Sequence, residues 1–224
     1  VWASMGQKEE AAQYARDCSQ LLVHMDQMQK PVVAALNGMA LGGGLELALR
    51  CTAMVSHKDA WFQFPEITLG ILPGIGGMAV PYRRWPESAD IFHKMIRTAS
   101  RLRANEALEM NMLAGIADNY LDLVTMATNQ VRALSQTPRK SLDGVVQIPA
   151  PSPGEARAAN GQPLSKEITG IISQAIENSA AAPTLAEALE IGYLAFADTA
   201  CTQAAQEGIS AFFGKRRPDF ETTG

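Results

Sequence analysis

Two glutamates beside a glycine-rich turn are the residues of this 224-residue chain whose types and spacing suggest chemistry. Glu46 follows the run Gly42-Gly43-Gly44, and Glu66 follows Pro65 further along the chain. A glycine-rich turn that opens into a helix directs free backbone N–H groups and the positive end of the helix dipole at an anion. An anion-binding turn flanked by two acids suggests acid–base chemistry at an activated carbonyl group.

Each of these features also has a simpler interpretation when it is taken alone. The glycines could form a tight turn, Glu46 could be an acid that the helix dipole stabilises, and Glu66 could be a solvated turn residue. Their occurrence together within one short stretch favours a functional site.

The elements that must position this site form a short α/β portion followed by helices. Apolar stretches predict strands over 32–36, 53–56 and 61–62, and the helix that carries Glu46 over 45–50. So few strands are scarcely enough for a self-sufficient sheet. Hydrophobic periodicity predicts further helices over 7–28, 78–84, 88–96, 103–112, 121–134, 165–179, 184–196 and 202–213.

Composition divides the chain into three parts. Residues 1–136 form the α/β core and the helices that follow it, and residues 164–224 form a C-terminal helical part. Between them, residues 137–163 are rich in Pro, Gly, Ala and Ser, which indicates a linker or a long surface excursion. Thr184 and Glu187 have the spacing of a capping box, which marks a helix start in the C-terminal part.

Charge and cysteine usage exclude several classes of partner. The net charge of −4 offers no general basic surface for nucleic acid. The three cysteines are scattered and lack metal-ligand spacing, so we expect reduced thiols and no metal site. No apolar run approaches the roughly 20 residues that span a bilayer, and no signal-peptide pattern opens the sequence. We therefore expect a cytoplasmic protein with no membrane partner.

Three motifs resemble the enoyl-CoA hydratase/isomerase (crotonase) superfamily. They are LNGMALGGGLELALRC, FPEITLGILPGIGG and EGISAFFGKRRPDF, and they occur in the family's order. The resemblance covers nearly the whole chain apart from 137–163. Within this superfamily, the sequence most resembles the hydratase part of bifunctional proteins that also carry a 3-hydroxyacyl-CoA dehydrogenase. The resemblance implies an α/β fold of the ClpP/crotonase type, a spiral of β-β-α units followed by a C-terminal helical part that builds trimers.

The resemblance also implies roles for individual residues. The backbone N–H of Gly43 would hold the thioester oxygen in the oxyanion hole, while Glu46 and Glu66 would flank one water as the catalytic pair. Two residues of the tail, Lys215 and Arg216, would contact the CoA phosphates. The substrate pocket would be formed by Gly42, Gly44, Phe64, Pro65, Leu69, Gly74 and Met78.

The activity that this resemblance implies is hydration of trans-2-enoyl-CoA to 3-hydroxyacyl-CoA in fatty-acid or related acyl-CoA degradation. The reaction would need no metal and no redox cofactor, since CoA is part of the substrate. The expected assembly is a homotrimer or a dimer of trimers. One alternative is a Δ3-Δ2 enoyl-CoA isomerase, which needs a single carboxylate. The other is an inactive structural or oligomerising segment.

The segment that would supply the second oxyanion N–H in the family does not occur in this sequence, nor do the strands around it. We therefore expect this chain to be a C-terminal portion of a longer protein. A fused 3-hydroxyacyl-CoA dehydrogenase domain would then lie upstream.

Overall fold

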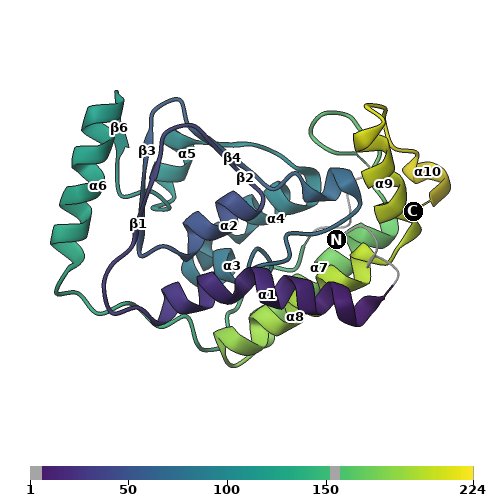
Figure 1. Ribbon diagram of the computed structural model, residues 1–224, viewed down its shortest axis with the longest axis horizontal. Coiled ribbons are helices and arrows are strands. Elements are labelled where there is room, and N and C mark those ends of the chain that lie inside the picture. The colour runs from purple at the N-terminus through teal and green to yellow at the C-terminus, as the bar shows by residue number, and fades with distance from the viewer. Residues whose placement is uncertain (1–6, 152–156, 224) are drawn as a thin grey trace.

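The computed structural model describes residues 7–151 and 157–223. Two three-stranded sheets and α6 occupy one end of the molecule's long axis, and α7, α9 and α10 occupy the other (Figure 1). The strands are β1 (Val33–Leu36), β2 (Met39–Leu41), β3 (Ala53–His57), β4 (Trp61–Gln63), β5 (Leu102–Arg103) and β6 (Ile116–Ala117). The helices are α1 (Lys8–Gln27), α2 (Gly43–Arg50), α3 (Val80–Arg84), α4 (Ala89–Thr98), α5 (Ala104–Glu109), α6 (Tyr120–Leu134), α7 (Lys166–Ala181), α8 (Leu185–Ala200), α9 (Gln203–Phe213) and α10 (Phe220–Thr223), with the 3-10 helices η2 (Glu66–Leu69) and η3 (Pro86–Ser88).

The strands form two successive turns of a spiral. β1 pairs in parallel with β3, with Val33 opposite Ala53, and β2 pairs in parallel with β4, with Met39 opposite Trp61. Each sheet therefore takes one strand from each turn, and α2 leads the chain from the second sheet back to the first. This repeat of β-β-helix units confirms the predicted crotonase-type spiral. It also places residues about twenty positions apart at equivalent sites in neighbouring turns.

One hydrophobic core joins the strands to the C-terminal helices. Its fully buried members include Leu45 and Leu49 of α2, Phe62 of β4 and Ile168 and Ile172 of α7. Because these apolar side chains lie in a single cluster, the helical part packs directly on the α/β part.

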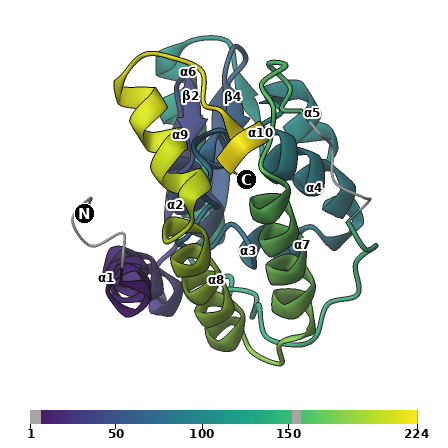
Figure 2. The ribbon, with the colours of Figure 1, turned by 90° about the vertical axis from the view of Figure 1, so that its right-hand side faces the viewer.

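The C-terminal helices reach back to the strands' loops. Helix α8 packs against both α7 and α1 (Figure 2). Helix α9 packs against η2. Two glycines allow this approach: a Cβ atom on Gly208 would overlap the Leu69 carbonyl, and one on Gly70 would lie 2.6 Å from the Ala204 carbonyl oxygen. Gly70 also has φ +72°, in the left-handed region that favours glycine. The backbone of α9 therefore rests on η2.

The Pro-rich segment 137–163 is tied to the body by hydrogen bonds. The Arg83 guanidinium donates to the carbonyls of Leu142 (2.8 Å) and Gly144 (2.7 Å), and His93 Nε2 lies 3.0 Å from the Pro149 oxygen. Its described residues contain no helix or named strand, and residues 152–156 of the segment lie outside the described ranges.

Most of the predicted elements occur where the periodicity places them. The helix predicted over 45–50 begins two residues earlier, at Gly43, and the one predicted over 78–84 begins at Val80. Strands β2, β5 and β6 are not predicted because two or three residues carry no alternating pattern. At the predicted capping box, the Thr184 side chain accepts the Glu187 N–H at 3.2 Å. Over residues 7–151 and 157–223, no helix has the length and apolarity needed to cross a bilayer.

Candidate active site

The glycine-rich turn between β2 and α2 brings an acidic side chain against the backbone. Gly42 has φ +49° and ψ −126°, and its N–H donates to the Gln63 carbonyl at 3.0 Å. A Cβ atom on Gly42 would overlap Glu66 Oε1 and lie 3.2 Å from Glu66 Cδ. Glycine at this position is thus required twice, by the backbone conformation and by the neighbouring carboxyl group.

Helix α2 begins directly after this turn. The Glu46 N–H donates to the Gly42 carbonyl at 2.9 Å, which closes the first helical turn. The N–H groups at the start of a helix have no intrahelical acceptor, so those of Gly43 and Gly44 remain available to a ligand. The structure therefore places Gly43 where an oxyanion could bind at the positive end of the α2 dipole.

Glu46 lies in the first turn of α2 with its carboxyl group buried against the loop that follows η2. The residue is 3% exposed. Its Oε1 atom accepts the backbone N–H of Gly77 at 2.7 Å and that of Ile75 at 2.9 Å. These two bonds fix the orientation of the carboxyl group.

Glu66 opens η2 one turn of the spiral later. Pro65 precedes it with φ −80°, which fixes the backbone at the start of the 3-10 helix. The Glu66 side chain is half-buried, and its Oε2 atom is shielded without a hydrogen-bond partner among the described residues. A shielded, unpaired carboxyl oxygen is costly in a folded protein and is common at sites of chemistry.

The two carboxyl groups influence each other's protonation. Burial raises the pKa of Glu46 to about 7, against the opposing effect of the Gly77 and Ile75 N–H groups and the positive charge of Arg50. Burial also raises the pKa of Glu66 to about 8, and the negative charge of Glu46 raises it further. The N–H groups of the loop and the Arg50 cation favour ionised Glu46, whereas only its own backbone N–H favours ionised Glu66, so Glu46 gives up its proton first. Near neutral pH the pair can hold one proton, so it offers one acid and one base.

Apolar side chains from distant parts of the chain lie around the loop that binds Glu46. The Cδ1 atom of Ile75 would be 3.7 Å from a Cβ atom on Gly43. The Phe196 ring of α8 packs on Gly74, where a Cβ atom would lie 2.6 Å from Phe196 Cδ2. Helix α8 thus contributes directly to the wall of the site.

The other residues of the predicted pocket differ in how deeply they are buried. Phe64 and Met78 are fully buried in the main core, and Met78 faces Gly192 of α8. Leu69 is half-buried at the end of η2. Gly44 has open space where a Cβ atom would be.

The two predicted CoA contacts lie after the end of α9. Arg216 forms an ion pair with Glu207 through both terminal nitrogens, and Lys215 is exposed. The pairing with Glu207 gives Arg216 a structural partner within its own chain. Its proposed contact with CoA stays a prediction.

Two residues near the site escaped the sequence analysis. Phe196 lies far from Gly74 in the sequence, and its helical periodicity marks it as an ordinary core position. Arg50 lies four residues after Glu46, so both project from one face of α2. A charged residue at that spacing, on a helix that is otherwise apolar, is the signal that could have identified it.

Comparison with known proteins gives consistent matches. Residues 3–150 match the enoyl-CoA hydratase/isomerase family model. The chain is 30% identical over 217 residues to 2,3-dehydroadipyl-CoA hydratase of Escherichia coli. This alignment covers 97% of the present chain and 73% of the Escherichia coli protein. It is 30% identical over 198 residues to the mitochondrial enoyl-CoA hydratase of Pongo abelii, with 88% and 58% coverage. The chain thus spans less than two thirds of the mitochondrial relative.

Among solved structures, an enoyl-CoA hydratase from Mycobacterium avium subsp. paratuberculosis aligns with a TM-score of 0.62. The sequence identity is 19%, and the alignment covers 94% of this chain and 73% of that one. This similarity shows a shared fold. Peroxisomal bifunctional enzymes match only part of the chain, 50% of it for the human protein.

Proposed function

Since the chain belongs to the enoyl-CoA hydratase/isomerase family, we propose that it is an enoyl-CoA hydratase, which adds water to trans-2-enoyl-CoA to give 3-hydroxyacyl-CoA. The observation that carries this proposal is that the carboxyl groups of Glu46 and Glu66, both shielded from water, lie close enough beside the N-terminus of α2 for the charge of one to affect the protonation of the other. The similarity to proteins named as acyl-CoA hydratases supports the substrate class.

In this mechanism the acyl thioester oxygen binds at the Gly43 N–H, with the α2 dipole behind it. Addition of a nucleophile at the β-carbon moves negative charge onto that oxygen, and a preorganised donor stabilises the resulting enolate. One such donor is typically worth roughly 3–4 kcal/mol of the barrier.

The two glutamates divide the proton transfers. Ionised Glu46 takes a proton from water as the water oxygen bonds to the β-carbon. Protonated Glu66 gives its proton to the α-carbon, so water adds across the double bond. The pair then holds one proton as before, now on Glu46, and proton exchange through the next water restores the starting state.

An isomerase would use the same turn with a single carboxyl group. Glu46→Gln and Glu66→Gln separate the two reactions, because hydration needs both groups and isomerisation needs one. For a hydratase, each variant should lose about 10²–10⁴-fold in the rate of crotonyl-CoA hydration, the usual contribution of one acid–base group. Glu177→Gln changes an exposed glutamate of α7 and should keep the full rate.

The result that contradicts the hydratase is an active enzyme in which either variant still hydrates crotonyl-CoA at nearly the wild-type rate. Conversion of a 3-enoyl-CoA that survives one of the two substitutions would instead favour the isomerase. A folded chain that binds no acyl-CoA in calorimetry would favour the purely structural segment.

A further inference from the structure

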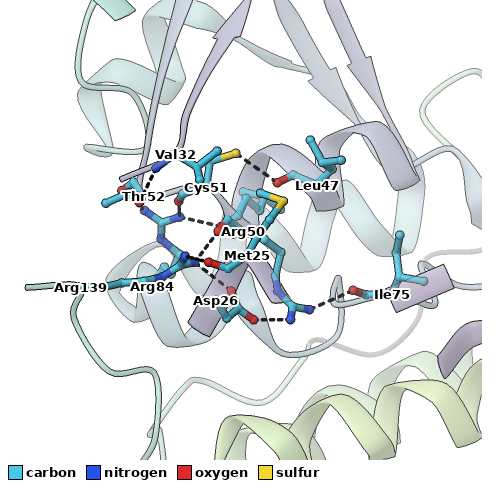
Figure 3. Close-up of polar contacts among 11 residues, drawn as sticks. Met25, Asp26, Val32, Leu47, Arg50, Cys51, Thr52, Ile75, Arg84 and Arg139 are labelled. Atoms are coloured by element: carbon cyan, nitrogen blue, oxygen red, sulfur yellow. Dashed lines mark hydrogen bonds and ion pairs between the residues drawn. The ribbon is translucent and has the colours of Figure 1, made fainter. Parts of the chain in front are cut away.

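A buried cation lies behind the loop that binds Glu46. Arg50 is the last residue of α2, and its side chain is fully buried. Figure 3 shows its guanidinium between Asp26 of α1 and the Ile75 carbonyl of the loop. A buried guanidinium usually has a specific partner that justifies the cost of removing it from water.

The contacts of Arg50 are divided between an anchor and the loop. Nη2 pairs with a carboxylate oxygen of Asp26, and Nη1 donates to the Ile75 oxygen at 3.3 Å. Nη1 would also lie 3.3 Å from a Cβ atom on Gly76, so the guanidinium rests on the loop backbone. The Nε atom has no hydrogen-bond partner within the described residues.

The opposite side of the same loop faces Glu46. The Ile75 and Gly77 N–H groups donate to Glu46 Oε1. The intervening Gly76 N–H also acts on this carboxyl group and lowers its pKa. The peptide that joins Ile75 to Gly76 therefore has its oxygen on the Arg50 cation and its N–H toward the Glu46 carboxylate. Its dipole is aligned favourably between the two charges.

The anchor is itself held in place. The second oxygen of Asp26 accepts a bond from Arg139 at 2.8 Å, and Arg139 also donates to the Met25 carbonyl at 2.7 Å and to the Arg50 carbonyl. These bonds tie the ends of α1 and α2 together (Figure 3). The position of Arg50 is thus set by groups outside the loop that it supports.

We propose that Arg50, anchored by Asp26, is a positioning residue that holds the loop of residues 75–77 with its N–H groups on Glu46, and so makes Glu46 the proton acceptor of the pair. This inference rests on the proposed function. It explains why the N–H groups of the loop face Glu46 and not Glu66, although both carboxyl groups are shielded from water.

The charged groups around Glu46 are few. Arg50 lies on its own helix, Glu66 faces it from η2, and Asp26 of α1 lies behind Arg50. The loop contributes only backbone N–H groups. A change at Arg50 therefore removes the cation that acts on Glu46 and releases the loop at the same time.

The test is the pH dependence of kcat/KM for crotonyl-CoA in Arg50→Met, Arg50→Lys and wild type. Loss of the cation and of the ordered N–H groups makes Glu46 harder to ionise. The acidic limb should move up by about one pH unit in Arg50→Met, which is a tenfold lower rate on that limb. Arg50→Lys should recover part of the change, while Arg101→Met, at an exposed surface arginine, should leave the profile unchanged.

Asp26→Asn separates positioning from charge. The substitution leaves the Arg50 cation in place but weakens its anchor. If Arg50 acts by positioning the loop, the acidic limb of the pH profile should move to higher pH. If Arg50 acted through its charge alone, removal of the opposing Asp26 charge would make Glu46 easier to ionise and would move the acidic limb to lower pH. A downward movement, or a uniform loss of rate with an unchanged limb in Arg50→Met, would overturn the proposal.

The proposal can also fail independently of the reaction. If the wild-type chain hydrates no enoyl-CoA, the proposed function fails, but the ¹³C carboxyl shift of Glu46 still reports its titration. In that case Arg50→Lys and Asp26→Asn, which keep a cation or a similar volume, should raise the titration midpoint in folded protein. An unchanged midpoint in both would refute the role of Arg50.

Discussion

Replacing Glu46 with glutamine should stabilise the fold at alkaline pH and leave it nearly unchanged in acid. Burial raises the pKa of this carboxyl group from 4.5 to about 7. The folded state therefore binds the Glu46 proton more tightly than the unfolded state does. That extra stability is complete below the unfolded pKa and disappears as the pH rises through the folded value. Above it, the wild-type fold must hold a buried negative charge.

The size of the effect follows from this difference in pKa. Each pKa unit corresponds to about 1.4 kcal/mol, so a rise from 4.5 to about 7 corresponds to on the order of 3 kcal/mol. Glutamine has nearly the same shape and can accept the Ile75 and Gly77 N–H groups through its amide oxygen. It carries no charge at any pH, so the penalty vanishes in the variant. Part of the pH dependence should remain, because Glu66 still titrates.

The assay is urea unfolding of wild type and Glu46→Gln at about pH 5 and pH 9. The two proteins should have similar free energies of unfolding at the lower pH. At the higher pH the variant should be more stable by up to about 3 kcal/mol. Glu177→Gln, at an exposed position on α7, should show no such difference. A variant that is less stable than wild type at pH 9 would refute a raised pKa at Glu46.

Three further substitutions test the geometry of the site. Gly42→Ala should lower the free energy of unfolding in urea by about 1–3 kcal/mol, because alanine is strained at this positive φ. The added methyl group should also displace Glu66, so the rate of crotonyl-CoA hydration should fall even in the protein that remains folded. Phe196→Ala removes the ring that packs on Gly74, so KM for crotonyl-CoA should rise. Because Phe196 is only half-buried, the free energy of unfolding should fall by less than the about 3–5 kcal/mol that is typical of a fully buried Phe. Gly208→Ala pushes α9 off η2 and should lower the melting temperature measured by circular dichroism.

Local patterns predict the elements of this fold better than they predict the contacts of the site. The apolar stretch at 32–36 and the periodic stretch at 184–196 correspond to β1 and α8 because each depends on its own residues. Strand β2 has only three residues next to a glycine turn, so its pairing with β4 comes from the spiral and not from its sequence.

The same limit applies to the residues around Glu46. The spacing of Glu46 and Glu66 matches one turn of the spiral, and their action as a catalytic pair is what the resemblance predicts. The partner of Arg50 lies 24 positions away, in a helix whose packing on α2 no local pattern describes. Phe196 meets Gly74 only after α8 folds back over the loop. Contacts made by tertiary packing are therefore the part that the sequence leaves undetermined.

The predicted stability gain and the predicted loss of hydration concern the same Glu46→Gln chain, and together they are more informative than either alone. A carboxyl group kept only for structure would, once ionised, bind the Ile75 and Gly77 N–H groups more strongly than a neutral glutamine does, so its replacement would destabilise the protein at pH 9. A carboxyl group kept for proton transfer does the opposite, since its raised pKa costs stability wherever it must ionise. A variant that is more stable at pH 9 yet fails to hydrate crotonyl-CoA would therefore assign Glu46 to the chemistry. A variant that loses activity and stability in parallel would assign it to the fold.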